Sequence, residues 1–291
     1  MKILIFGHNG WIGSQFTAQL DILNISYIKA TSRADNSNGV TEEILQHSPT
    51  HIISLIGRTH GVHNGVKINT IDYLEEDGKL QENVNDNLFG PMVLGLLCET
   101  YNIHFTYIGT GCIFEYDQTH PYGLEYNGFT EDSEPNFVGS SYSIVKGYTD
   151  RLVKLLPRCL NLRIRMPITN QNHPRNFISK ILSYDKICSI PNSMTVLPLL
   201  LPVLVRMMQD KRTGTYNFVN PGLISHNEIL EMYKTKIDPT FSWKNFDMKE
   251  QDKILRSRRS NNYLETTKLT SSYEVPSIKK SVEWCFDNWI N

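Results

Sequence analysis

Short apolar runs recur along the first part of the chain, and stretches compatible with helices separate them. The apolar runs predict strands at residues 2–6, 26–30, 51–56, 104–108 and 160–166. The stretches between them predict helices at residues 11–20, 41–46, 87–101 and 142–156. This alternation predicts an α/β fold with a doubly wound parallel sheet, covered by helices on both faces.

The pattern loosens after Pro167, where polar loops and a proline-punctuated apolar run follow. We therefore predict two domains, a nucleotide-binding domain at residues 1–167 and a smaller substrate-binding lobe at residues 168–291. A possible strand at residues 215–219 would return to the main sheet and interleave the two.

Composition and charge narrow the class of protein. The 291 residues carry a formal charge of -1, which gives no electrostatic footprint for nucleic acid or for an acidic membrane surface. The most apolar stretch, residues 196–205, contains two prolines and is too short to span a bilayer, so we expect no membrane partner. The first residues run directly into a glycine-rich loop and leave no room for a targeting leader.

The cysteines and histidines indicate a reduced compartment and no catalytic metal. Five cysteines are scattered without a CxxC pair, which suits free thiols in a cytoplasmic protein. His8, His63 and His226 have no partners at metal-ligand spacing.

A GxxGxxG motif links the first predicted strand to the first predicted helix, which is the context expected of a Rossmann-type dinucleotide-binding loop. Glycines let the backbone approach a pyrophosphate, and the helix N-terminus offers free N–H donors. The alternative is an ordinary glycine-rich turn. We predict cofactor contacts at Gly7, Asn9, Gly10, Trp11, Ile12 and Gly13.

The end of the second predicted strand indicates which cofactor binds. An acidic residue there would bind the ribose of NAD, whereas this chain has Ser32 and Arg33, which suit the 2′-phosphate of NADP. We therefore predict NADPH, with a solvated surface arginine as the alternative for Arg33. Gly57, after the third strand, is predicted to lie along the cofactor.

A YxxxK motif and a threonine indicate proton transfer. Tyr142 and Lys146 lie four residues apart on one face of a predicted helix, where the ammonium would stabilise the phenolate. Thr110 ends a predicted strand and can hydrogen-bond a substrate carbonyl. The alternative is that Thr110 is a turn residue and Tyr142 a half-buried helix aromatic.

Together these motifs resemble the extended short-chain dehydrogenase/reductases over essentially the whole chain. Several separate blocks narrow the resemblance to the bifunctional 3,5-epimerase/4-reductases that make UDP-L-rhamnose. These blocks are GTGCIFE at 109–115, RIRMPI at 163–168, NHPRNFI at 172–178, IPNSMT at 190–195, NPGLISHNE at 220–228 and RSNN at 259–262.

The resemblance implies that UDP-4-keto-6-deoxy-D-glucose is inverted at C3 and C5 and then reduced at C4 by NADPH. Sugar 4,6-dehydratases of the superfamily have an Asp-Glu pair where this chain has Gly111 and Cys112, so dehydration is not expected. The resemblance assigns the proton transfers of epimerisation to Cys112 and Lys180 and leaves open which of them is the base. A small buried thiol and a solvated helix lysine are the structural alternatives.

Substrate contacts are predicted on five separate segments of the chain. Thr59 and His60 would reach the sugar together with Thr110, and Arg175, Asn176 and Arg259 would bind the diphosphate, with Asn192 at the uridine. Each of them could instead have a purely structural role. The helix that carries YxxxK has apolar residues that suit either the core or a homodimer interface, namely Ile144, Val145, Leu152, Leu155 and Leu156.

Two other functions remain open at this point. One is a 4-keto-reductase similar to dTDP-4-dehydrorhamnose reductases, with epimerisation done by another enzyme. The other is a cofactor-sensing regulator without catalysis, which the complete set of Thr110, Tyr142 and Lys146 argues against.

Overall fold

The computed structural model describes residues 1–290 and divides the chain into two compact units. Unit 1 comprises residues 1–113, 134–163 and 201–216, and unit 2 comprises residues 114–133, 164–200 and 217–291. One crossing of the chain, at residues 163/164, lies close to the division predicted at residue 167. The others, at 113/114, 133/134, 200/201 and 216/217, have no counterpart in a two-segment division.

A six-stranded sheet forms the centre of unit 1 and confirms the predicted α/β class. Its order is β10-β7-β6-β3-β1-β2, and β1 pairs in parallel with β2 and β3, as does β3 with β6. Every residue of β1, β3 and β6 is buried, which is typical of a parallel sheet covered on both faces. The strands are β1 (Ile3–Phe6), β2 (Tyr27–Lys29), β3 (His51–Ser54), β6 (His104–Thr110), β7 (Cys159–Ile164) and β10 (Gly214–Asn217).

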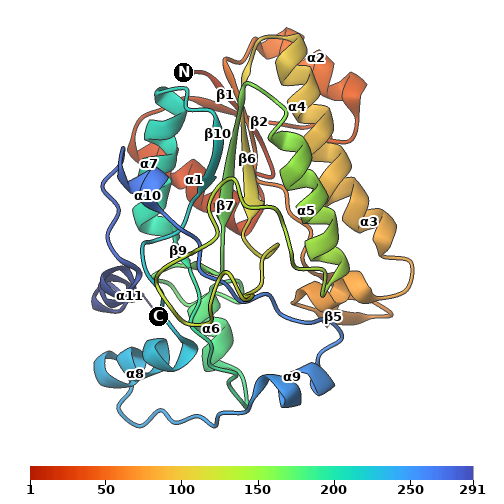
Figure 1. Ribbon diagram of the computed structural model, residues 1–291. Coiled ribbons are helices and arrows are strands. Elements are labelled where there is room, and N and C mark those ends of the chain that lie inside the picture. The colour runs from red at the N-terminus through yellow and green to blue at the C-terminus, as the bar shows by residue number, and fades with distance from the viewer. Residues whose placement is uncertain (291) are drawn as a thin grey trace. The chain divides into compact units, whose positions relative to one another are not determined.

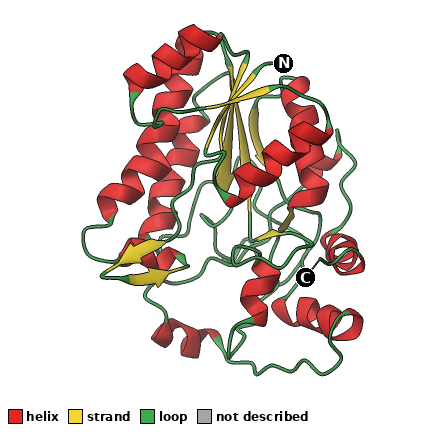
Figure 2. Cartoon of the chain, turned by 180° about the vertical axis from the view of Figure 1, so that it is seen from behind, coloured by secondary structure: helices red, strands yellow, loops and turns green. Residues whose placement is uncertain are grey.

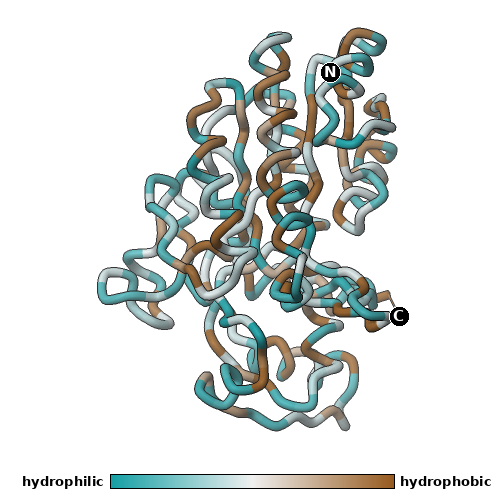
Figure 3. The backbone as a smooth tube through the Cα atoms, turned by 90° about the vertical axis from the view of Figure 1, so that its right-hand side faces the viewer, coloured by the Kyte–Doolittle hydropathy of each residue, from teal (hydrophilic) through white to brown (hydrophobic). Residues whose placement is uncertain are grey.

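Helices cover the sheet on its two faces. In Figures 1 and 2, α2, α4 and α5 lie along one face of the sheet and α1 lies on the other. Hydrophobic and hydrophilic segments alternate along these helices (Figure 3), as expected where one side of each helix packs on the sheet. The helices are α1 (Trp11–Ile22), α2 (Ser37–His47), α3 (Leu80–Val84), α4 (Gly90–Thr100) and α5 (Ser141–Val153).

The helix predicted at residues 87–101 begins earlier and is not uniform. α3 continues through a π-helical turn, η2 (Asn85–Phe89), into α4, whose first turn contains Pro91. Single π-helical turns inside helices often mark functional sites. This turn presents Asp86 and Asn87, which both contact the loop after β3.

A segment between β3 and α3 was not predicted as regular structure. It forms an antiparallel hairpin, β4 (Gly61–His63) and β5 (Val66–Ile68), followed by a 3-10 helix, η1 (Ile71–Glu75). Figure 2 shows the hairpin as the pair of short arrows beside the ends of the long helices. The strands have only three residues each, too few for a periodic hydrophobic pattern to identify them.

Unit 2 has its own hydrophobic core, built around Ile168, Met194, Ile224, Leu230 and Phe286. Within the part of the chain that the structure describes, no helix combines the length and the apolar character needed to cross a membrane. The elements from β8 onward are β8 (Pro167–Ile168), α6 (Phe177–Leu182), β9 (Thr195–Val196), α7 (Leu197–Gln209), α8 (His226–Lys236), α9 (Met248–Ile254), α10 (Thr267–Thr270) and α11 (Ile278–Asp287), of which α7 spans the division between the units.

Candidate active site

The glycine motif forms the tight turn between β1 and α1. Gly7 has a φ of 83°, and a Cβ on Gly13 would lie 2.2 Å from the carbonyl oxygen of Gly7. Glycine is therefore required at both positions if the loop is to keep this path. Gly10 is the N-cap of α1, and as a glycine it has no side chain with which to cap the N–H groups of the first turn. This is the arrangement that binds a phosphate at a helix N-terminus.

A cavity of about 550 Å³ adjoins this loop. Gly7 and Asn9 line it on one side, and Ser32, Arg33 and Asp86 line it on another. Its position beside an uncapped helix N-terminus and at the carboxyl ends of β1 and β2 fits the adenosine part of a nicotinamide dinucleotide.

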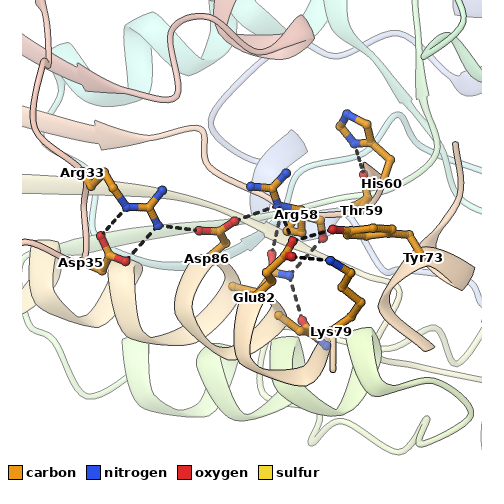
Figure 4. Close-up of polar contacts among 11 residues, drawn as sticks. Arg33, Asp35, Arg58, Thr59, His60, Tyr73, Lys79, Glu82 and Asp86 are labelled. Atoms are coloured by element: carbon orange, nitrogen blue, oxygen red, sulfur yellow. Dashed lines mark hydrogen bonds and ion pairs between the residues drawn. The ribbon is translucent and has the colours of Figure 1, made fainter. Parts of the chain in front are cut away.

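Arg33 forms ion pairs with two carboxylates, and its side chain is 67% exposed. Its guanidinium donates to Asp35 through Nε and Nη2, both at 2.9 Å, and Nη2 also lies 3.4 Å from Asp86 (Figure 4). These contacts raise the pKa of Arg33, chiefly through the hydrogen bond to Asp35. The sequence analysis missed both carboxylates, although Asp35 is only two residues from Arg33.

A third unpredicted carboxylate, Glu43, fixes the turn that carries Ser32. The Glu43 side chain, on α2, accepts hydrogen bonds from the backbone N–H groups of Ser32 and Thr31 and from the Thr31 hydroxyl. Glu43 is buried, and these donors lower its pKa against the opposing effect of burial. The turn around Ser32 is thus set before any ligand binds.

The loop after β3 continues the chain of polar contacts. Arg58 Nε donates to Asp86 at 2.8 Å, so that Asp86 bridges Arg33 and Arg58 (Figure 4). The Asn87 side chain exchanges two hydrogen bonds of 3.0 Å with the Arg58 backbone. Gly57 is exposed, and a Cβ there would have no neighbour within 4 Å, which leaves room for a ligand against the backbone.

Thr59 and His60 follow directly and are both half-buried. Thr59 Oγ1 lies 3.5 Å from His60 Nδ1. Both side chains come from the carboxyl edge of the sheet, where parallel α/β sheets bind ligands.

Tyr142, Thr110 and Cys112 come together in unit 1. Tyr142 is 8% exposed, and burial raises its pKa, with a smaller contribution from Cys112, whereas a hydrogen bond with Thr110 lowers it. The backbone N–H of Cys112 donates to Thr110 Oγ1 at 3.1 Å, which fixes the residue that carries the thiol. The phenol is therefore protonated near neutral pH and can act as an acid.

Lys146 contacts a second tyrosine in the structure, and the stabilisation of the Tyr142 phenolate by its ammonium stays a prediction. Its Nζ donates to the hydroxyl of Tyr107 on β6 and lies 4.5 Å from the centroid of that ring. Burial lowers the pKa of Lys146 to about 7, against opposing effects of Asp150 and Cys112. Tyr107 is fully inside the sheet and had no signal in the sequence beyond an apolar strand.

In unit 2, Lys180 on α6 belongs to a cluster of cations. Burial, together with the positive charges of Arg175 and Arg259, lowers the pKa of Lys180 to about 8. Burial also lowers the pKa of Arg175. A lysine with two arginines close enough to act on its charge is an arrangement suited to an anion such as a diphosphate.

The two asparagines predicted to bind substrate instead stabilise unit 2. Asn176 accepts hydrogen bonds from Thr169 and Ile178 and donates to Thr169 and Gln171. Asn192 accepts from Arg165 and Asn262 and donates to Ile190 and Asn261. A carboxamide has two donors and two lone pairs, so neither side chain has hydrogen-bonding capacity left for a ligand.

Within residues 1–290, no group of three His, Cys, Asp or Glu side chains is placed to hold a metal ion. The glycine loop and the groups around Tyr142 belong to unit 1, and the cations around Lys180 belong to unit 2.

No family model matches the chain. A protein of Acanthamoeba polyphaga mimivirus is 52% identical over 280 residues, which cover 96% of this chain and 95% of the relative. A bifunctional dTDP-4-dehydrorhamnose 3,5-epimerase/dTDP-4-dehydrorhamnose reductase of Arabidopsis thaliana is 41% identical and covers 97% of this chain and 91% of its own length. A trifunctional enzyme of the same plant is 40% identical, but the match spans 41% of its length.

Solved structures give the same picture. The crystal structure of a UDP-rhamnose synthase of Acanthamoeba polyphaga mimivirus matches with a TM-score of 0.94 and 50% identity over 99% of both chains. A dTDP-4-dehydrorhamnose reductase of Bacillus anthracis in complex with NADP matches with a TM-score of 0.78 at 16% identity over 98% of this chain and 97% of the other, which shows a shared fold.

Proposed function

Because this chain belongs to the family of 3,5-epimerase/4-keto-reductase enzymes of rhamnose synthesis, we propose that it converts UDP-4-keto-6-deoxy-D-glucose into UDP-L-rhamnose. The observation that carries the proposal is the grouping of Cys112 with Thr110 and Tyr142 in unit 1. A threonine and a protonated tyrosine supply the hydrogen bond and the proton that a ketone needs when a cofactor reduces it with a hydride. A thiol beside them adds a group that can exchange protons with the carbons next to that ketone.

For the reduction, we propose NADPH as the cofactor. When bound, it supplies a hydride to C4, and the proton for the C4 oxygen comes from the Tyr142 hydroxyl, with Thr110 hydrogen-bonded to the same oxygen. The raised pKa of Tyr142 supports this role because it keeps the phenol protonated until the alkoxide forms. Ser32 and Arg33 support the choice of NADPH, because Arg33 lines the cavity next to the nucleotide loop.

For the epimerisation, we propose that Cys112 and Lys180 exchange the protons at C3 and C5. One group removes the carbon-bound proton while the C4 oxygen carries the enolate charge, and the other returns a proton on the opposite face. The lowered pKa of Lys180 supports this role, because an amine must be neutral to accept a proton. No electrons are transferred in this half of the reaction.

For binding, we propose that Arg175 and Arg259 contact the diphosphate and that Thr59 and His60 contact the sugar. Two arginines match the charge and geometry of a diphosphate. Asn176 and Asn192 are left out of the proposed ligands because their side chains are saturated within unit 2.

The test is a single incubation of the purified protein with UDP-4-keto-6-deoxy-D-glucose and NADPH in D₂O, read by NMR and mass spectrometry. Deuterium at C3 and C5 of an L-rhamno product supports the proposal. Reduction of the ketone without deuterium at C3 and C5 would show that the protein is a 4-keto-reductase without epimerase activity. No hydride transfer at all would contradict an enzymatic role for this substrate.

Cys112→Ser and Lys180→Met test the epimerisation separately. We expect exchange at C3 and C5 to fall by about 10²-fold or more, as is typical when a general acid or base is removed. Reduction of a pre-epimerised 4-keto-L-sugar should continue in both variants. Normal exchange in both would show that other groups transfer the protons.

We further propose a cytoplasmic homodimer that forms through α4 and α5. Exposed apolar side chains lie within or directly beside these two helices. They are Phe89, Leu96, Ile144, Tyr148, Leu152 and Leu155. The five cysteines are free in the structure, which fits a reducing compartment. Light scattering tests the dimer, and a monomer mass at micromolar concentration would contradict it.

A further inference from the structure

Two consecutive residues of η1, in the unpredicted segment between β3 and α3, hold the first residue of the helix that carries Tyr142. Glu75 Oε1 accepts a hydrogen bond from the backbone N–H of Ser141 at 2.7 Å, and the Ser141 hydroxyl lies 2.9 Å from the same oxygen. That hydroxyl also lies 3.1 Å from the carbonyl oxygen of Leu74. Ser141 directly precedes Tyr142, so these contacts are made one residue from the catalytic phenol.

η1 also packs on Tyr142 itself. Tyr73 and Leu74 form a buried apolar cluster with Tyr142, and Cys112 is packed against that cluster. The Tyr73 ring is fixed in turn, because its hydroxyl donates to Glu82 at 2.7 Å (Figure 4). From the other side, Gly61 lies so close to this ring that a Cβ would be 2.4 Å from it. η1 therefore contacts both the hairpin and the start of α5.

The contact with Glu75 is not needed to form the helix. α5 already has a local N-cap, since Ser140 accepts a hydrogen bond from the backbone N–H of Ser143 at 3.1 Å. Glu75 adds an acceptor from 66 residues away in the chain. A local cap stabilises the helix wherever it lies, whereas a distant acceptor fixes where the start of the helix lies against the rest of unit 1.

We propose that Glu75, acting through Ser141, is a positioning residue that holds the Tyr142 phenol against Thr110 and Cys112 for proton transfer. The charged acceptor at the positive end of α5 makes this a strong contact. Small displacements of a reacting group are costly, since a shift of about 1 Å can lower a rate about 10²-fold. The proposal rests on the role proposed above for Tyr142.

Kinetics on the full-length chain test it with four variants. Glu75→Ala should lower kcat for reduction at least about tenfold with KM within about twofold, because binding groups are untouched. Ser141→Ala removes the hydroxyl and keeps the backbone N–H, so its loss should be smaller, about threefold. Glu75→Gln keeps an oxygen acceptor and should recover most of the rate.

Ser140→Ala is the matched control, because it removes the local cap of the same helix and leaves the Glu75 contact intact. It should lower the melting temperature and leave kcat near the wild-type value. If Ser140→Ala and Glu75→Ala lower kcat equally at equal loss of stability, Glu75 has only a structural role and the proposal fails. The proposal also fails if Glu75→Gln is as impaired as Glu75→Ala.

A second readout does not depend on the substrate. The ¹³C resonance of the Tyr142 phenol carbon, identified by its loss in Tyr142→Phe, reports the pKa of that phenol in the free protein. In Glu75→Ala this pKa should fall toward the ordinary value near 10, since a loosened helix start admits water and reduces the burial that raises it. An unchanged titration would overturn the positioning role. If the wild-type protein shows no turnover with the proposed substrate, the proposed function fails while this titration still tests Glu75.

Discussion

Units 1 and 2 both contain buried cationic side chains, but their surroundings differ in kind. Lys146 in unit 1 has a hydroxyl acceptor in Tyr107 and a carboxylate nearby in Asp150, and its pKa is about 7. Lys180 in unit 2 has two arginines nearby, which add to the effect of burial, and its pKa is about 8.

The difference shows how one chain can prepare two kinds of chemistry. In unit 1, opposing effects act on each group, so Tyr142 stays protonated while Lys146 titrates near neutral pH. In unit 2, like charges accumulate and disfavour the charged lysine, a state that an anionic ligand would relieve. These differences fit the proposed use of unit 1 for proton donation and of unit 2 for binding an anion beside a base.

The largest effect is expected from Tyr142→Phe, which removes the acid from unit 1. Reduction should fall about 10²- to 10⁴-fold, because the alkoxide at C4 loses its proton donor. Exchange at C3 and C5 should fall less, since Cys112 and Lys180 remain. Tyr148→Phe is the matched control on the same helix, because its side chain is exposed. Equal reduction rates in the two variants would exclude Tyr142 as the acid.

The next largest effect is expected from Asp150→Asn, which removes the carboxylate near Lys146 in unit 1. Asp150 forms a buried ion pair with Arg163 at 2.6 Å and accepts from Asn161 at 2.8 Å. Asp150→Asn leaves the guanidinium buried without its counterion, which should lower the free energy of unfolding by about 3–5 kcal/mol. Urea denaturation measures this. The double variant Asp150→Asn/Arg163→Met should recover much of the loss, and no recovery would show that the ion pair is not the cause.

The comparison also explains which features the sequence could predict. The parallel sheet, the glycine loop and the helix of Tyr142 depend on patterns within a few residues, and the structure confirms all three. The carboxylates of Asp86, Glu43 and Glu75 act across the fold on Arg33, Ser32 and Ser141. These partners are separated by 53, 11 and 66 residues, so no local pattern indicates them.

Two asparagines show that the residue type can also predict a ligand contact for a side chain whose hydrogen bonds are already used. Asn176 and Asn192 have the chemistry of ligand-binding residues, and the sequence predicts that use. Their side chains are instead saturated by hydrogen bonds within unit 2. A residue type shows what a side chain can bind, but only the surrounding backbone shows whether that capacity is already used.

A pH profile tests the cation cluster of unit 2. Because the pKa of Lys180 is lowered to about 8, its neutral fraction rises as the pH rises through 8, and exchange at C3 and C5 should rise with it if Lys180 is the base. Arg175→Gln removes one positive charge near Lys180, so the pKa of Lys180 should rise. The pH range over which the exchange rate increases should then move to higher pH by up to about one unit. Lys186→Gln, an exposed lysine of the same unit, is the control. An unchanged pH dependence of exchange in Arg175→Gln would contradict the electrostatic origin of the lowered Lys180 pKa.

The smallest effect is expected from Tyr107→Phe, which removes only the hydroxyl that Lys146 contacts in unit 1. The pKa of Lys146 is about 7. Losing the hydroxyl oxygen that accepts from its ammonium should lower this pKa, because a hydrogen bond to the charged form stabilises that form. The charged fraction at pH 7.5 then falls, so reduction should drop about two- to fivefold at that pH, by the population shift that about half a pKa unit gives. At pH 6 most of the lysine is charged in both proteins and the loss should shrink.

The change in stability in Tyr107→Phe should be about 1 kcal/mol, the usual value for one hydrogen bond. Tyr101→Phe, at a partly exposed tyrosine, should change neither quantity. A loss that is equal at pH 6 and pH 7.5 would show that Tyr107 supports the shape of the site rather than the charge of Lys146.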